Sequence, residues 1–301
     1  MHQLMIFFDF FLQGDAKLNP DSLPVLNEQT HLDFICHRCG SCCSHIRGFL
    51  GEDEKKFFEE YAYGKLPLVQ LIPIERTSFP LWDWEAKRFQ EGAKELNIDS
   101  KIIPSRGVFD QKEQRTIIFT FSIDSDSCTF LHNGQCRIYD KRGFICKLFP
   151  FQKSPFLKTK ESFSIHSLFG GCPSITHIIP HVPKESAQMV RFLHEHFGET
   201  FLNAVQHDIV TEWANEMMIM LMKKNVLKPI MNYPYDLLMK KISSSPFIDL
   251  TEFLVEKAIY SREQMDRIIS DFDHGVQAHQ RIKEAIEDDF HSSDEGIRSQ
   301  E

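Results

Sequence analysis

The sequence predicts an α+β protein with a small cysteine-rich domain followed by a mainly helical region. Two observations carry this prediction. All eight cysteines fall between residues 36 and 172, where short apolar segments alternate with polar ones. From about residue 185 onward, apolar residues recur at the three-and-four spacing of amphipathic helices. We therefore expect a cysteine-cluster domain over residues 1–180, a helical domain over 181–290 and a disordered tail over 291–301.

The first half of the chain predicts a mixture of short elements. In the segment 116–123, Ile117, Phe119, Phe121 and Ile123 take alternate positions, which indicates a half-buried strand. Asn133-Gly134 predicts a tight turn that brings Cys128 and Cys136 near each other. The other elements expected here are helices over 55–61 and 82–97, strands near 31–35, 102–103, 107–109 and 163–165, and a buried strand or helix over 1–12.

The second half predicts four helices, over residues 186–205, 208–224, 251–260 and 263–289. In the last of these, Met265, Ile268, Phe272 and Val276 follow one face. The tail from His291 lacks apolar residues, so its composition does not support a packed structure.

Two apolar runs bear on the compartment. The run 1–12 has no Lys or Arg at its start and is interrupted by Asp9, which is unlike a secretory signal. The run Met217–Met222 is far shorter than the roughly 20 apolar residues that span a bilayer. We expect a cytoplasmic protein without a membrane partner, in a compartment where clustered cysteines more often bind metal than form disulfides.

The net charge of −9 is unevenly distributed. Residues 1–172 hold 21 Lys and Arg against 22 Asp and Glu, whereas residues 173–301 hold 13 against 21. Nothing here forms the basic footprint of a nucleic-acid-binding protein. The acidic second half is typical of a solvated helical surface, and docking of a protein partner there is the alternative.

The segment Cys36-His-Arg-Cys39-Gly-Ser-Cys42-Cys43 carries the chemistry of the chain. Four cysteines within eight residues suit the soft ligand set of zinc, iron or an iron–sulfur cluster. Cys36, Cys39 and Cys42 have the C-x-x-C-x-x-C spacing of bacterial-type ferredoxins, and Cys172-Pro173 resembles the remote Cys-Pro ligand of such sites. The remaining candidate ligands are Cys43, Cys128, Cys136 and Cys146.

We hypothesise two centres, one held by Cys36, Cys39, Cys42 and Cys172 and the other by Cys43, Cys128, Cys136 and Cys146. The division rests on the expectation that side chains of the neighbours Cys42 and Cys43 diverge. The spacings favour an iron–sulfur cluster, of the 4Fe-4S type, and two four-thiolate zinc sites are the alternative. Cations near the later cysteines would hold the ligands deprotonated; they are Arg137, Lys141, Arg142 and Lys147.

The run CHRCGSCC and the later run CTFLHNGQCRIYDKRGFICKLFPF resemble the YkgJ-type cysteine-cluster family, which is described as a zinc- or iron-chelating domain. The resemblance covers residues 34–43 and 128–151, with Cys172 as the trailing cysteine. It implies metal binding. Some relatives are flagellin lysine N-methylases thought to carry an iron–sulfur cluster, which makes a lysine N-methylase-like enzyme an alternative function.

The sequence itself names no reaction. It has neither the C-x-x-x-C-x-x-C motif of radical-SAM enzymes nor a G-x-G turn after a strand. It also lacks a P-loop, H-E-x-x-H and G-x-S-x-G, so no catalytic residue is indicated. Three classes remain: a redox or catalytic iron–sulfur protein, a zinc-stabilised interaction scaffold, and a protein that stores or delivers metal ions.

Overall fold

The computed structural model describes residues 32–47, 56, 60, 62–151 and 171–298. Within them the fold is α+β, as predicted. The expected elements over 1–12 and 163–165, and nearly all of the helix expected over 55–61, lie outside the described residues. Residues 32–35 form no strand, contrary to expectation, because Phe34 instead donates a backbone hydrogen bond to the end of a helix at His196.

A four-stranded sheet forms the first layer, in the order β1-β2-β3-β6. The strands are β1 (Val69–Gln70), β2 (Ile102–Asp110), β3 (Arg115–Ile123) and β6 (Phe247–Asp249). β3 pairs antiparallel with β2 and parallel with β6. The two short strands expected near 102–103 and 107–109 form one strand with an irregular register around Arg106. β3 is buried on both faces rather than one, because helices and loops cover both sides.

Helix α4 (Asp83–Glu95) packs on the sheet and matches the helix expected over 82–97. Trp84, Phe89 and Ala93 lie on its buried face. The backbone N–H of Trp82 donates to the Glu85 carboxylate at 3.0 Å, which satisfies one of the free donors at the start of the helix. The Trp-rich helix start is therefore part of the core.

Short elements follow the sheet and carry the later cysteines. A hairpin of β4 (Leu131–His132) and β5 (Gln135–Cys136) turns at Asn133 and Gly134, whose φ angles of 50° and 75° confirm the predicted tight turn. The remaining short helices are α2 (Ser41–Ser44), α5 (Phe144–Lys147) and the 3₁₀ turns Ile74–Arg76, Tyr139–Lys141, Pro173–Ile175 and Ile179–His181.

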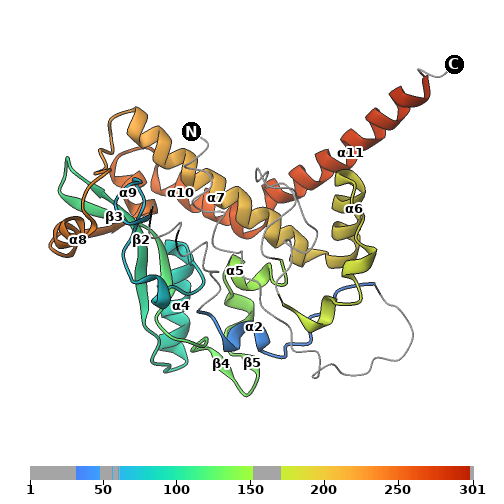
Figure 1. Cartoon of the computed structure of the whole chain (residues 1–301), viewed down its shortest axis with the longest axis horizontal. Helices are drawn as coiled ribbons and strands as arrows, with labels where there is room; N and C mark the ends of the chain where they lie inside the picture. Colours follow the sequence, from blue (N-terminus) through green and yellow to red (C-terminus); the bar gives the residue numbers. More distant parts are fainter. Residues whose placement is uncertain (1–31, 48–55, 57–59, 61, 152–170, 299–301) are drawn as a thin grey trace.

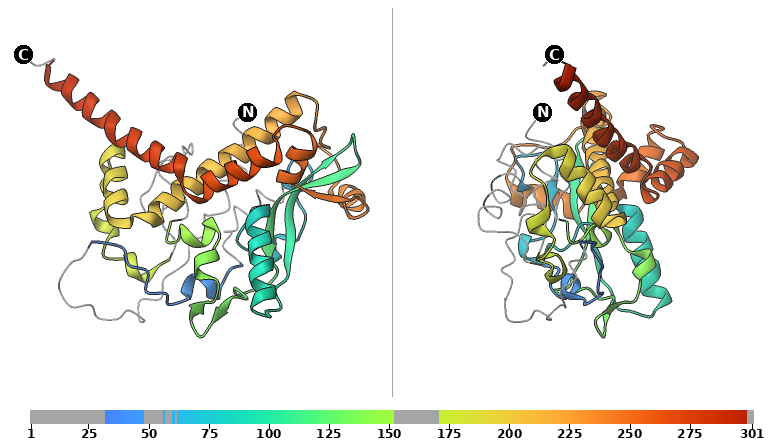
Figure 2. Two further views of the ribbon diagram at one scale, coloured as in Figure 1. Left: turned by 180° about the vertical axis from the view of Figure 1, so that it is seen from behind. Right: turned by 90° about the vertical axis from the view of Figure 1, so that its right-hand side faces the viewer.

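The second half contains six described helices: α6 (Ser186–Phe197), α7 (Glu199–Lys223), α8 (Tyr235–Ser243), α9 (Leu250–Glu256), α10 (Arg262–Asp273) and α11 (Val276–Arg298). In Figures 1 and 2, α7 runs across the molecule and the end of α11 projects from it. None of the described helices is long and apolar enough to cross a membrane. The tail from His291 was predicted to be disordered, but α11 extends through it as far as Arg298. The limits proposed for the two domains stay predictions.

The helix boundaries differ from those expected. The predicted helices over 186–205 and 208–224 are instead divided at Gly198, where φ is 48°, and the helix predicted over 263–289 is divided at Gly275, where φ is 66°. Positive φ values end a helix, and glycine adopts them without a steric penalty. α8 and β6 were not predicted, because their segments are too short to show a clear period.

Packing crosses the expected boundary at residue 180. Most core side chains form one continuous cluster from Ile46 to Ile282, and β6 adds a strand from the helical half to the sheet. The ring of Phe151 packs against Phe197 and Phe201, with ring centroids 4.9 and 5.6 Å apart. The cysteine-bearing loops therefore rest on helices α6 and α7.

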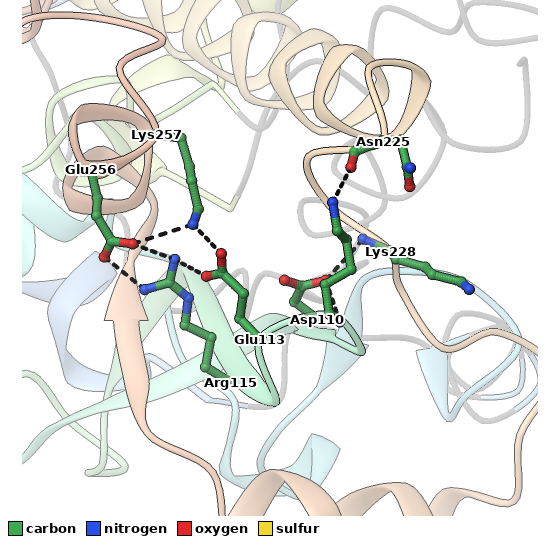
Figure 3. Close-up of polar contacts among 8 residues, drawn as sticks. Asp110, Glu113, Arg115, Asn225, Lys228, Glu256 and Lys257 are labelled. Atoms are coloured by element: carbon green, nitrogen blue, oxygen red, sulfur yellow. Dashed lines mark hydrogen bonds and ion pairs between the residues drawn. The ribbon is translucent and has the colours of Figure 1, made fainter.

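An ion-pair cluster joins the β2–β3 turn to the end of α9 (Figure 3). The guanidinium of Arg115 donates to both carboxylate oxygens of Glu256, at 2.7 and 2.8 Å. Lys257 and Arg115 also pair with Glu113. A bidentate pair inside a network holds its geometry better than an isolated surface pair. This cluster fixes α9 beside the hairpin.

Asp83 forms a second contact between the halves, and it predicts a pH effect on stability. Its buried carboxylate accepts hydrogen bonds from the backbone N–H and the hydroxyl of Thr251 at the start of α9. Burial raises the pKa of Asp83 to about 6. Because the folded pKa lies above the unfolded value, this group lowers the free energy of unfolding as pH rises from about 4 to about 6, by up to about 3 kcal/mol.

Urea unfolding of wild type and Asp83→Asn at pH 4 and pH 7 tests this expectation. Asparagine keeps an acceptor for Thr251 and does not titrate. The stability of the variant relative to wild type should therefore rise between the two pH values. A difference that stays constant with pH would rule out the titration of Asp83 as the cause.

Candidate metal centre

Six of the eight cysteines line one pocket. They come from three separate segments of the chain, in α2 and the loop before it, around the β4–β5 hairpin, and in α5. These residues are Cys36, Cys42, Cys43, Cys128, Cys136 and Cys146. Apolar side chains complete most of the wall: Phe79, Phe89, Leu131, Ile138, Ile145 and Phe149. Among the described residues that line the pocket, none is acidic and the charged ones are Arg38 and Arg142.

Backbone hydrogen bonds hold the first cysteine segment against the second. The N–H of Cys128 donates to the carbonyl of Cys43 at 2.8 Å, and the N–H of Ile46 donates to the carbonyl of Asp126 at 2.9 Å. Gly40 begins α2 with a φ of 75°, and a Cβ there would lie 2.9 Å from Leu131 and 3.1 Å from the Gly134 carbonyl. A glycine is required for this close approach of α2 to the hairpin.

The buried carboxylate of Glu85 positions α5, which carries Cys146. One oxygen accepts the N–H of Trp82 and the other accepts the N–H of Phe144 at 2.6 Å. A Cβ on Gly143 would lie 2.9 Å from the Glu85 carboxylate, so glycine leaves room for this contact. Burial raises the pKa of Glu85, and the two backbone donors oppose that rise. The carboxylate thus fixes the start of α5 to the start of α4.

The expectation that the side chains of Cys42 and Cys43 diverge is wrong. Their Sγ atoms lie 3.8 Å apart. Both residues belong to the single helical turn α2, where neighbouring side chains are separated by about 100° rather than the 180° of a strand. Two thiolates at about 2.3 Å from one tetrahedral zinc ion also have sulfurs about 3.8 Å apart. The two sulfurs are therefore as far apart as two ligands of a single zinc ion.

Cys43 is at the centre of the thiol interactions. Hydrogen bonds from Cys128 and then Cys42 lower the pKa of Cys43, while the same contacts raise the pKa values of both donors. Burial, followed by the charge of Cys43, raises the pKa of Cys146. The thiolate is the form that binds metal, so Cys43 is the group best prepared as a ligand.

Cys39 and Cys172 do not line the pocket. Cys172 is buried just before the 3₁₀ turn Pro173–Ile175, whereas Cys36 and Cys39 are exposed. Burial raises the pKa of Cys172, and the charges of Cys39 and Cys36 raise it further, so these thiols lie within electrostatic range of one another. None of the eight cysteines, all of them among the described residues, forms a disulfide.

Comparison with known proteins bears on this arrangement. Residues 35–165 match a family model named CxxCxxCC, whose description is "putative zinc- or iron-chelating domain". This segment is similar to that domain. The match confirms the predicted cysteine-cluster family and supports binding of zinc or iron. Cys172 and the helical second half lie beyond the matched residues. No curated protein and no solved structure matches the chain.

Thiol sulfurs, which are soft ligands, line the cysteine pocket, and the cavity volume of about 50 Å³ exceeds the 10–15 Å³ that one water molecule needs. Within the described ranges, no group of three or more His, Cys, Asp or Glu side chains is already arranged around a single point. Binding would therefore draw the sulfurs together, as expected where metal binding and folding are coupled.

The matched segment contains two features that sequence reasoning missed. Arg38 was not singled out, yet its guanidinium stacks on Tyr139 beside the pocket. Glu85 was not predicted to act on the cysteines either, although its position three residues after Trp82 signals a helix-capping carboxylate. Of the four predicted cations, Arg142 lines the pocket, whereas Lys141 pairs with Glu95 at 2.6 Å.

Proposed function

We propose that this protein binds metal through its eight cysteines and that the metal is an iron–sulfur cluster of the 4Fe-4S type. The observation that carries the proposal is the convergence of six cysteines from three chain segments on one pocket. The C-x-x-C-x-x-C spacing of Cys36, Cys39 and Cys42 supports a cluster rather than a single ion. When bound, such a cluster supplies one-electron transfer or a Lewis-acidic iron.

The thiol interactions support the two proposed groups of ligands. Cys43 interacts with Cys128, Cys136 and Cys146, which are the other members of one group. Cys172 interacts with Cys39 and Cys36, which belong to the other. Cys42 is the exception, since it interacts with Cys43 and Cys146 of the second group more strongly than with Cys36 of its own group. Burial raises the pKa values of Cys136 and Cys146, and the charge of Arg142 opposes that rise; hydrogen bonds from Cys128 and Cys42, with a smaller effect of Arg142, lower the pKa of Cys43.

Zinc is the second candidate, and one observation favours it. The distance of 3.8 Å between the Sγ atoms of Cys42 and Cys43 equals the sulfur spacing around a single tetrahedral zinc ion. Four-thiolate zinc sites would stabilise the fold directly and would require no redox chemistry. The zinc-stabilised protein would then present its acidic helical half to a protein partner.

Anaerobic purification followed by metal analysis and a visible spectrum tests the proposal. We expect a brown protein with iron, acid-labile sulfide and an absorbance band near about 400 nm that oxygen bleaches. A colourless protein with stoichiometric zinc would instead establish the second candidate. The matched control replaces Cys36, Cys39, Cys42 and Cys43 with serine together. Wild-type protein that holds neither metal, or the same metal content in the control, would contradict metal binding through these cysteines.

A further inference from the structure

The two charged side chains of the cysteine pocket stack on one aromatic ring. The guanidinium carbon of Arg38 lies 4.1 Å from the centroid of the Tyr139 ring, and that of Arg142 lies 3.7 Å from it. Arg38 comes from the first cysteine segment and Arg142 from the second, so the ring brings together two cations that lie far apart in sequence. Stacking on the face of the ring orients both guanidinium groups and does not use their N–H donors.

The partners of these two arginines differ from those of six other described arginines. Arg142 donates from Nε to the Tyr139 carbonyl at 3.0 Å and from Nη1 to the Cys146 carbonyl at 3.4 Å, and both acceptors are neutral. Arg38 forms no ion pair with any described residue, and its side chain is exposed. In contrast, carboxylates pair with Arg47, Arg76, Arg88, Arg115, Arg262 and Arg281.

The roles of the two cations are also distinct. The charge of Arg142 acts on the thiols of Cys43, Cys136 and Cys146, so part of its charge balances the ligand set. Arg38 lies on the exposed edge of the same pocket, where its N–H groups face no carboxylate of the described chain. A planar guanidinium binds a planar carboxylate through two parallel hydrogen bonds. The charge pattern at the edge of the pocket therefore suits a carboxylate ligand.

We propose that Arg38, together with Arg142 on the Tyr139 ring, receives the metal as an anionic carboxylate chelate of the citrate type. This inference rests on the zinc candidate proposed above, in which the cysteines hold single metal ions. Two guanidinium groups disfavour the approach of a free divalent cation and favour a chelate of net negative charge. The thiolate sulfurs then replace the carboxylate oxygens on the metal ion. Each thiol that becomes a ligand releases a proton to solvent, the metal keeps its oxidation state, and the chelator leaves as a free anion.

Stopped-flow measurement of metal uptake tests the proposal. Reduced, metal-free full-length protein is mixed with zinc citrate or with zinc sulfate in a non-coordinating buffer, and proton release is followed with a pH indicator. Arg38→Met should slow uptake from zinc citrate by about tenfold and leave uptake from zinc sulfate within about twofold of wild type. Arg38→Lys keeps the charge without the two-pronged donor and should give an intermediate rate from zinc citrate.

Lys240→Met is the matched control, because it removes one positive charge at an exposed position on α8. We expect its uptake rates from both zinc sources to equal those of wild type. Equal rates for wild type and Arg38→Met with zinc citrate would overturn the proposal, and so would equal slowing of Arg38→Met with both zinc sources. If wild-type protein takes up zinc from neither source, the protein does not bind zinc. That result differs from normal zinc uptake that Arg38→Met leaves unchanged or slows equally from both sources, which would overturn only the role of Arg38.

Discussion

Replacement of Cys43 by serine is expected to remove the metal bound with Cys128, Cys136 and Cys146. Cys43 accepts hydrogen bonds from two neighbouring thiols, and its low pKa makes it the most available thiolate of the pocket. A serine hydroxyl is a hard, neutral oxygen and a poor ligand for iron or zinc. Metal affinity at this centre should fall by at least about 100-fold, measured as metal retained against a chelator of known affinity.

Cys172→Ser provides the comparison for Cys43→Ser. Cys172 lies outside the pocket lining and interacts with Cys39 and Cys36. If two centres exist, each single variant should lose part of the metal and retain the rest, and the two losses should add in the double variant. Loss of all metal in either single variant would show one shared centre and would reject the division into two groups of four.

Glu85→Gln should weaken metal binding without changing any cysteine. The carboxylate accepts the N–H groups of Trp82 and Phe144, and glutamine offers only one acceptor oxygen with an amide donor in place of the other. One buried N–H would then face another donor, at a cost of about 3 kcal/mol in unfolding free energy. Because α5 carries Cys146, metal affinity should fall by about 10–100-fold, the effect typical of residues that orient ligands.

The matched control for this prediction is Glu95→Gln on the same helix. Glu95 is exposed and pairs with Lys141 at 2.6 Å, so its loss should change the unfolding free energy by less than about 1 kcal/mol. Chelator competition and chemical unfolding of both variants give the comparison. Equal metal affinity in Glu85→Gln and wild type would show that the carboxylate does not position Cys146.

Local sequence patterns predicted those elements whose signals are complete within a few residues. The alternation from Ile117 to Ile123 predicted β3, and the apolar face of residues 82–97 predicted α4. Asn133-Gly134 predicted the hairpin because both residues tolerate positive φ. Cysteine spacing likewise predicted the cluster family, which depends on residue types rather than on packing.

The elements that were missed depend on contacts between distant segments. β6 has three residues and becomes a strand by pairing with β3, a partner 131 positions away in the register of Thr116 with Phe247. The breaks at Gly198 and Gly275 lie where both helical periods continue across the glycine, so periodicity alone does not locate them. Glycine permits the turn, and the packing of the flanking helices selects it.

In the cysteine pocket, too, some features follow from residue type and others depend on contacts between distant segments. The sequence by itself determined which atoms are offered to a metal, because soft sulfur ligands at short spacings are a property of residue type. Only the tertiary structure decided which sulfurs meet, that Cys42 and Cys43 converge within one helical turn, and that Arg38 joins Arg142 on Tyr139. Those arrangements depend on hydrogen bonds such as Cys128 to Cys43 and Phe144 to Glu85, which join segments 85 and 59 residues apart and leave no periodic trace in the sequence.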